Sequence, residues 1–194
     1  ILKKSNVDEM KKIWLDALPE NIKSIIGEFS IKSYLNKFFS NNNNLGLGLF
    51  QSNKIEGFVL YGNDDEIVKK IITENFLKIL ITFFKNLFLL NFIHLKRYFD
   101  VLFFMFFSKK IESEIKKKNC ELLIIVFKKE TQNKGFGSFL LKNSFSNYKD
   151  FFLKFEGVFV KTLKNTPENI SFYKKNNFIF LREVYKRVYL NIKF

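Results

Sequence analysis

The chain has 194 residues, 47% of them hydrophobic, and is therefore long and apolar enough to bury a core rather than remain disordered. Its net charge is +14, and its basic residues are nearly all lysines, the arginines being Arg97, Arg182 and Arg187. Because Phe, Lys, Asn and Ile, whose codons are rich in A and T, are all abundant, we attribute this charge mainly to composition bias. The sequence has no helix-turn-helix or RNA-binding motif, so we expect no nucleic-acid partner, although the positive field favours an anionic ligand.

Cysteine and histidine are too scarce for several kinds of site. Cys120 and His94 are the only residues of their types, which excludes an internal disulfide and a His/Cys metal cluster. The same scarcity disfavours a Ser-His-Asp or Cys-His nucleophile. We expect a cytoplasmic protein without a metal cofactor and, because Ile1 is not an initiator methionine, further residues before it.

In chain order, the first third predicts a short strand, two helices and a hairpin. Residues 1–3 are typical of the end of a strand. The helix that follows has apolar residues at helical spacing, namely Val7, Met10, Ile13, Trp14 and Ala17. Ser30 caps a second helix, whose apolar positions are Ile31, Leu35, Phe38 and Phe39. Residues 45–51 and 54–62 predict two strands joined by a Ser52-Asn53 turn.

Residues 64–114 predict a helical insertion between this hairpin and the next strand. Its apolar helix faces comprise Phe76, Ile79, Leu80, Phe83, Phe84 and Leu87, and later Leu95, Phe99, Leu102, Phe103 and Phe106. Charged residues interrupt the run too often for a membrane span, which needs roughly 20 apolar residues. Three interpretations are open: the insertion packs onto the domain and lines one side of its ligand cleft, mediates a homodimer, or docks peripherally on a membrane.

The last part of the chain predicts strands that alternate with helices. The strands are expected at residues 120–127, 157–163, 178–183 and 188–192. A glycine-bearing turn and a helix follow the first of them. The next helix has Thr166 as its N-cap and Pro167 at its first position, and Asn177 suits a left-handed cap at its end.

Strand, turn and helix meet at residues 132–138 and predict an anion site. The unpaired N–H groups and the dipole of a helix start attract phosphate, and Gly135 and Gly137 allow its close approach. The segment lacks the G-x-x-x-x-G-K-[ST] pattern of a Walker loop. A dinucleotide fingerprint needs a third glycine three positions after Gly137, and this chain has Leu140 there, so it lacks that fingerprint too. A third pattern, [QR]-x-x-G-x-[GA], is met by Gln132, Gly135 and Gly137.

With this pattern the sequence resembles the GNAT superfamily of acyl-CoA-dependent N-acyltransferases. A second stretch, residues 166–178, is similar to the other motif of that family, a helix with a Phe-Tyr pair (here Phe172-Tyr173) followed by a turn and a short strand. Asn177 stands where the family usually has glycine. Together the two motifs cover residues 120–180.

The resemblance implies one α/β domain over residues 1–194, with the helical insertion at 64–114. Its sheet would be mixed, mostly antiparallel and twisted, in the order β-αα-βββ-α-β-α-ββ, with flanking helices and the insertion between strands 3 and 4. Acetyl-CoA is the implied acyl donor, acetyl being the default chain. Its contacts would come from Ile125, Val126 and Phe127 along the pantetheine arm, and from Gln132, Asn133, Lys134, Gly135, Phe136, Gly137, Ser138, Thr166 and Asn169.

The resemblance also implies catalytic roles. Tyr173 would be the general acid that protonates the departing thiolate, the alternative being an aromatic packing residue beside Phe172. Glu121 is the leading general base, the alternative being a solvated carboxylate at a strand end. Some relatives carry a glutamate on the strand before the Tyr helix, where this chain has Lys161.

We therefore predict an N-acetyltransferase that transfers an acetyl group from acetyl-CoA to a primary amine of a small molecule, with an amino-sugar (free or nucleotide-linked) as the leading acceptor. One alternative is acetylation of a protein or peptide amine. Another is a non-catalytic acyl-CoA-binding or scaffold domain, against which the intact glycines and Tyr173 argue.

Overall fold

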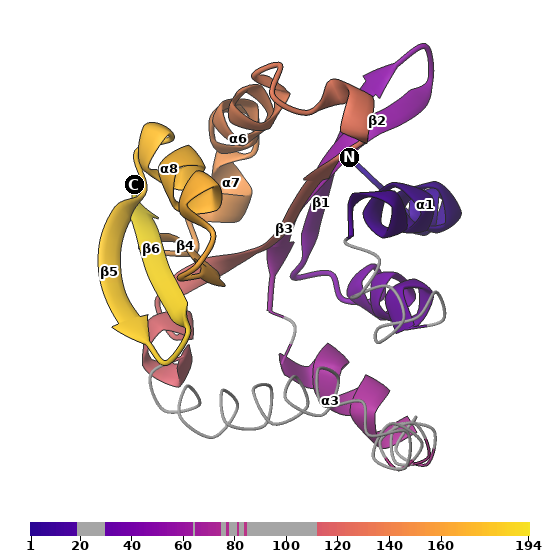
Figure 1. The fold of residues 1–194 in the computed structure, drawn as a ribbon, viewed down its shortest axis with the longest axis horizontal. Helices are drawn as coiled ribbons and strands as arrows, with labels where there is room; N and C mark the ends of the chain where they lie inside the picture. Colours follow the sequence, from indigo (N-terminus) through magenta and orange to yellow (C-terminus); the bar gives the residue numbers. More distant parts are fainter. Residues whose placement is uncertain (19–29, 64, 75–76, 78–80, 82–83, 85–111) are drawn as a thin grey trace.

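The computed structural model describes residues 1–18, 30–63, 65–74, 77, 81, 84 and 112–194 (Figure 1). Its helices are η1 (Lys4–Asn6), α1 (Val7–Ala17), α3 (Asp65–Glu74), η2 (Lys129–Thr131), α6 (Phe136–Asn147), α7 (Lys149–Phe152) and α8 (Pro167–Lys175). Residues 30–38 and 112–116 are also helical. The strands are β1 (Leu45–Gln51), β2 (Lys54–Gly62), β3 (Asn119–Phe127), β4 (Gly157–Leu163), β5 (Ile179–Val184) and β6 (Arg187–Lys193).

The strands form one six-stranded sheet in the order β1-β2-β3-β4-β6-β5. The β3–β4 pair is parallel, and the other four pairs are antiparallel. Figure 1 shows α1 on one side of β1–β3 and α6, α7 and α8 on the other. The predicted mixed, mostly antiparallel sheet flanked by helices is confirmed.

β2 shows why the sheet is covered on both faces, because its side chains alternate between two cores. Phe58 and Leu60 belong to a core with α1 and the helix at residues 30–38. Val59 and Tyr61 belong to a core with α6, α7 and α8. The two N-terminal helices bury positions predicted from their spacing, namely Val7, Met10, Ile13, Ile31, Leu35 and Phe38.

The β1–β2 hairpin also has the predicted connection. Ser52 and Asn53 both have positive φ angles, 48° and 64°, as the tightest hairpin turns require. The strand predicted at residues 1–3 is wrong. Leu2 N–H donates one hydrogen bond to the Gly46 carbonyl oxygen (2.8 Å), but Lys3 N–H turns to the Asn6 side chain (2.9 Å) and the chain enters η1 at once.

Most of the predicted insertion lies outside the described residues. α3 and the helical turn at residues 112–116 are its two ends and agree with the helical pattern. The side chains of Leu77, Ile81 and Phe84 are 71%, 66% and 46% exposed. Most residues of the predicted apolar faces lie outside the described part of the chain. The three interpretations of the insertion depend on these faces and therefore stay predictions. Among the described helices, none is long and apolar enough to cross a membrane.

Gly157, the first residue of β4, leaves no space for a side chain. A Cβ there would lie 2.2 Å from the carbonyl oxygen of Ile192 on β6, and a paired backbone cannot step aside as a side chain can. We expect Gly157→Ala to lower the free energy of unfolding by about 1–3 kcal/mol. In thermal unfolding, each kcal/mol would lower Tm by about 2–4 °C.

Gly48→Ala is the matched control for this substitution. The nearest atoms to a Cβ at Gly48 would be side-chain atoms of Leu2 and Phe50, at 3.0 Å, and side chains can move. Its Tm should therefore fall less than that of Gly157→Ala, and equal Tm values would contradict the backbone overlap.

Candidate functional site

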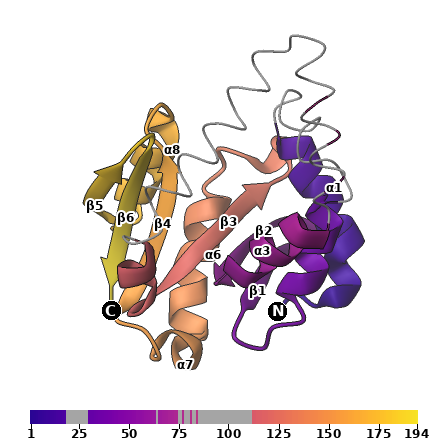
Figure 2. The same cartoon turned by 90° about the horizontal axis from the view of Figure 1, so that it is seen from below.

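β3 and β4 lie side by side where they begin and then separate. They pair only between Asn119–Glu121 and Gly157–Phe159. Leu123 has no partner on β2, which makes it a β-bulge at the point of separation. Beyond this point no described strand pairs with that edge of β3, and Figure 2 shows β3 running away from β4. An unpaired strand edge offers backbone N–H and C=O groups to an extended ligand.

The loop that follows β3 is fixed to neighbouring strands. Lys128 N–H donates to the Glu56 carbonyl oxygen (2.9 Å), and Lys128 Nζ pairs with the Glu56 carboxylate (2.7 Å). Gln132, the first residue of the GNAT-like pattern, donates from Nε2 to the Phe127 carbonyl oxygen (2.9 Å). The Gln132 side chain therefore closes the loop onto the end of β3.

Two left-handed residues turn this loop into α6. Asn133 has φ 59°, and Gly135, the N-cap, has φ 82°. A Cβ at Gly135 would meet no atom within 4 Å, so glycine is favoured here by conformation and not by space. The first backbone bond of α6 runs from Phe139 N–H to the Gly135 oxygen (3.0 Å), which leaves the amides of residues 136–138 at the open helix end. With the exposed Lys134 beside them, these amides suit an anion.

Gly137 has a different environment. A Cβ there would lie 3.1 Å from the ring of Phe172 on α8, so this glycine lets the two helices approach closely. The sequence pattern assigned Gly137 to close approach of phosphate, whereas its neighbour in the structure is an aromatic ring of the second motif.

The second motif has the predicted local form. Pro167 is the first residue of α8, and Asn177 is left-handed with φ 66°. Thr166 is the N-cap residue, but its hydroxyl donates to the Leu163 carbonyl oxygen (2.7 Å) and does not cap a helix amide. Asn169 is exposed on the first turn.

Tyr173 lies on the face of α8 that packs into the core with the sheet, and it is 7% exposed. Its ring centroid lies 5.2 Å from that of Phe172 and 5.6 Å from that of Phe178. Burial raises the pKa of its phenol above the ordinary value. A phenol is protonated at neutral pH in any case, and burial extends the protonated form of Tyr173 to higher pH. The structure therefore places Tyr173 as a packing residue beside Phe172, and its hydroxyl carries a proton.

Glu121 is buried where β3 and β4 separate, at 2% exposure. Cys120 and Leu122 belong to the core under α6, so by strand alternation Glu121 lies on the opposite face of the sheet. Its Oε2 lies 3.1 Å from Lys116 Nζ, and its Oε1 lies 3.0 Å from Lys161 Nζ. The alternative of a solvated strand-end carboxylate is therefore wrong.

These residues form part of a buried ionic cluster that the sequence analysis missed. Glu112 Oε2 lies 3.7 Å from Lys116 Nζ and 3.4 Å from Lys161 Nζ. Glu112 Oε1 accepts a hydrogen bond from the Tyr189 hydroxyl (2.8 Å), and burial raises the pKa of this phenol. The i,i+4 spacing of Glu112 and Lys116 is the one visible signal, because the other members lie on β3, β4 and β6 and meet only in the fold.

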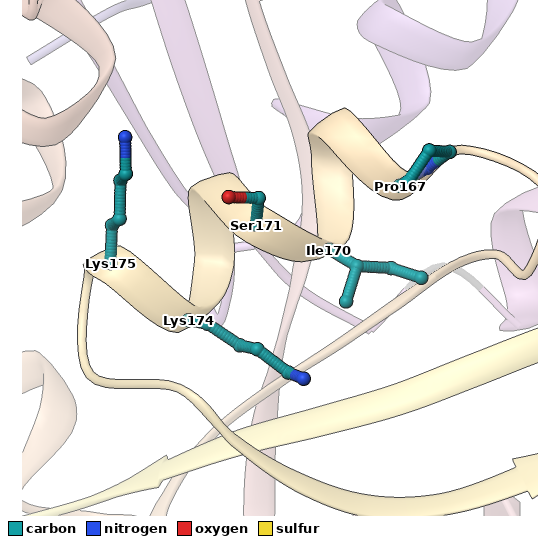
Figure 3. Close-up of a pocket in the computed structure, with 5 residues that line it drawn as sticks. All are labelled: Pro167, Ile170, Ser171, Lys174 and Lys175. Carbon is teal, nitrogen blue, oxygen red and sulfur yellow. The ribbon is translucent and has the colours of Figure 1, made fainter.

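A separate surface hollow of about 550 Å³ lies along α8. It is lined by Pro167, Ile170, Ser171, Lys174 and Lys175 (Figure 3). Figure 3 shows Ile170 and Lys174 pointing to one side of the helix and Ser171 and Lys175 to the other. None of the residues predicted for catalysis or cofactor binding lines this hollow, so we do not assign it to the site.

No protein-family model and no curated protein matches the sequence. Solved structures do match its fold. The PaiA N-acetyltransferase of Thermoplasma acidophilum, solved in complex with coenzyme A, has a TM-score of 0.59 at 14% identity, over 100% of this chain and 96% of that one. A GNAT-family acetyltransferase of Streptococcus pneumoniae has a TM-score of 0.52 at 15% identity, over 98% and 93%. The ribosomal-protein-alanine N-acetyltransferase of Brucella melitensis has 0.58 at 8%, over 100% and 97%. The chain therefore has the fold of the GNAT acetyltransferases, as its two motifs predicted.

The ionic cluster generates a prediction about stability. Glu121→Gln removes the carboxylate from between two largely buried ammonium groups, so we expect the free energy of unfolding to fall by about 3 kcal/mol. Glu156→Gln is the matched control, because Glu156 pairs with Lys118 where both side chains are more than 60% exposed. Such a pair is worth about 0.5 kcal/mol. Denaturant unfolding of both variants measures the difference, and equal losses would mean that the cluster stabilises no more than a surface pair.

Proposed function

We propose that this protein is an acetyl-CoA-dependent N-acetyltransferase. The observation that carries the proposal is an open, glycine-capped helix end placed just after a strand with one unpaired edge. The helix end suits a pyrophosphate, and the strand edge suits an extended pantetheine arm. The fold shared with GNAT acetyltransferases, one of which was solved with coenzyme A, supports this assignment.

The donor contacts follow from this placement. Ile125, Val126 and Phe127 on β3 would hold the pantetheine arm, and residues 132–138 would hold the pyrophosphate. Thr166 and Asn169, at the start of α8, would complete the cofactor contacts. The net charge of +14 adds a general attraction for this anionic donor.

Transfer of an acetyl group from a thioester to an amine needs one proton removed from the amine and one supplied to the leaving thiolate. Tyr173 is our candidate for the proton donor, because of its place in the second motif and because its phenol stays protonated well above neutral pH. Glu121 is our candidate for the base, because it is a buried carboxylate at the point where β3 and β4 separate. Since lysines contact both Glu121 oxygens, the amine proton would reach it through a water molecule.

We propose a primary amine of a small molecule as the acceptor, with an amino-sugar, free or nucleotide-linked, as the leading class. On the sheet face opposite α6, three carboxylates (Asp65, Glu112 and Glu121) surround the two lysines Lys116 and Lys161, and this excess of negative charge would favour an ammonium group nearby. The second candidate is a protein or peptide amine, which the likeness to a ribosomal-protein-alanine N-acetyltransferase supports.

The first prediction from this proposal concerns ligand-dependent stability. Acetyl-CoA and CoA at about 100 times Kd should each stabilise the fold by about 2.7 kcal/mol, because they bind only the folded state. Thermal unfolding at two salt concentrations would detect this as a rise in Tm, and ATP should produce none. An equal rise with ATP would indicate general anion binding, and no rise with any of the three would contradict the proposed function.

The second prediction concerns Tyr173. Tyr173→Phe keeps the ring and removes the proton donor, so acetyl-CoA affinity should be retained while kcat falls about a hundredfold. Because the folded-state pKa of this phenol is raised above its ordinary value near 10, the protonated form persists as pH rises. The wild-type rate should therefore not decline between about pH 8 and 10 through this group.

Tyr148→Phe is the matched control for Tyr173→Phe. Tyr148 lies at the junction of α6 and α7, is also partly buried against the same core, and loses the same hydroxyl. Steady-state kinetics with a panel of amines would compare the two variants. An unchanged kcat in Tyr173→Phe would remove Tyr173 from the reaction and leave it as a packing residue.

A further inference from the structure

Asn176 connects the end of α8 to the first turn of α6. The residue is 7% exposed. Its Nδ2 lies 3.0 Å from Ser138 Oγ and 2.8 Å from the Phe172 carbonyl oxygen. Its Oδ1 is buried and has no hydrogen-bond partner within the described ranges. Ser138 is the third residue of α6, beside the free amides of the helix end.

The Phe172 carbonyl determines how the Asn176 amide is oriented. A carbonyl oxygen accepts hydrogen bonds and donates none, so the NH2 group of Asn176 and not its Oδ1 must face it. The second hydrogen of the same NH2 group then points to Ser138 Oγ. In this contact Asn176 is the donor and Ser138 is the acceptor.

This contact in turn orients the Ser138 hydroxyl. A serine hydroxyl has one hydrogen, and an oxygen lone pair that accepts from Asn176 requires that hydrogen to point elsewhere. Ser138 is half-buried at the open end of α6, next to the amides of residues 136–138. Its hydroxyl hydrogen is thus available to a ligand oxygen at the same helix end.

We propose that Asn176 is a positioning residue for the pyrophosphate of the donor. It holds the Ser138 hydroxyl as a hydrogen-bond donor toward the open end of α6 and does not itself contact the donor molecule. This inference rests on the proposed acetyl-CoA function and adds a residue of the second motif to the anion site of the first.

The same residue links the anion site to the candidate proton donor. The backbone N–H groups of Asn176 and Phe178 both donate to the Tyr173 carbonyl oxygen, at 3.0 Å. The segment after α8 is therefore bonded to the backbone of Tyr173, and the Asn176 side chain also bonds it to Ser138 on α6.

The test compares acetyl-CoA with S-acetylpantetheine, which has the same thioester and arm but no pyrophosphate. Asn176→Ala and Ser138→Ala should each weaken CoA binding about tenfold in calorimetry, because each loses one hydrogen bond to a charged group. The double variant should lose no more, since Asn176 acts through Ser138. In kinetics, kcat/KM for acetyl-CoA should fall about tenfold with this affinity, whereas kcat/KM for S-acetylpantetheine should stay within about twofold of wild type.

Two further variants sharpen the comparison. Asn143→Ala is the matched control, because Asn143 Nδ2 donates to the Phe139 carbonyl oxygen (2.8 Å) with the same four-residue spacing. This variant should bind CoA and use S-acetylpantetheine as wild type does. Asn176→Asp keeps the shape but removes the NH2 group, so the Ser138 hydroxyl would turn toward the new carboxylate. CoA binding should then weaken at least as much as in Asn176→Ala.

Equal losses of kcat/KM for acetyl-CoA and S-acetylpantetheine, or additive losses of CoA affinity in the double variant, would show that Asn176 only supports the fold in general. Either result would overturn the inference. Unchanged CoA affinity in Asn176→Ala would overturn it as well. If Asn176→Ala does not fold, Ser138→Ala carries the same comparison, and wild-type affinity for CoA in that variant would refute the proposal. Wild-type protein that binds no CoA at all would refute the proposed function, and this inference with it.

Discussion

The separation of β3 from β4 is the constraint on which the candidate site depends. The two strands pair over three residues, after which the bulge at Leu123 increases the local twist of β3. Strands paired along their full length would satisfy each other's backbone groups and leave none for a ligand. Leu122 of β3 and Val160 of β4 instead pack in one core with Tyr173 and Phe178. Side chains from both strands and from the end of α8 thus share one core beside the point of separation.

Close contact between α6 and α8 is the second constraint. Gly137 gives Phe172 the space to approach α6, and Asn176 bonds back to Ser138. These contacts hold the open end of α6 in a defined position relative to the helix that carries Tyr173. The glycines of the first motif therefore divide between two tasks, since Gly135 provides the left-handed turn and Gly137 the helix contact.

The opposite face of the sheet carries the ionic cluster as well as the apolar core under α1. Glu121 and Glu112 lie between Lys116 and Lys161 in a largely buried setting, where removing one partner costs far more than at the surface. Lys116 also pairs with Asp65, the first residue of α3. Both ends of the insertion therefore meet at this lysine beside the sheet. Because the entropic cost of closing a loop grows only slowly with its length, a long insertion between these two ends adds little to that cost.

Local sequence signals determined most of the described helices and strands and the positions of both motifs. Periodicity and turn residues act within a few positions, so the bounds of β1, β2 and β4 and the left-handed Asn177 were predicted from sequence. The same locality explains the error at residues 1–3, where the Asn6 side chain captures the backbone of the expected strand. Only the tertiary structure decided that β3 and β4 separate, that Gly137 meets an aromatic ring, and that Glu121 lies between two lysines. These features join residues on different helices and strands, for example Gly137 with Phe172, 35 positions apart, and Glu121 with Lys161, 40 positions apart, and their energies exist only once the core has assembled.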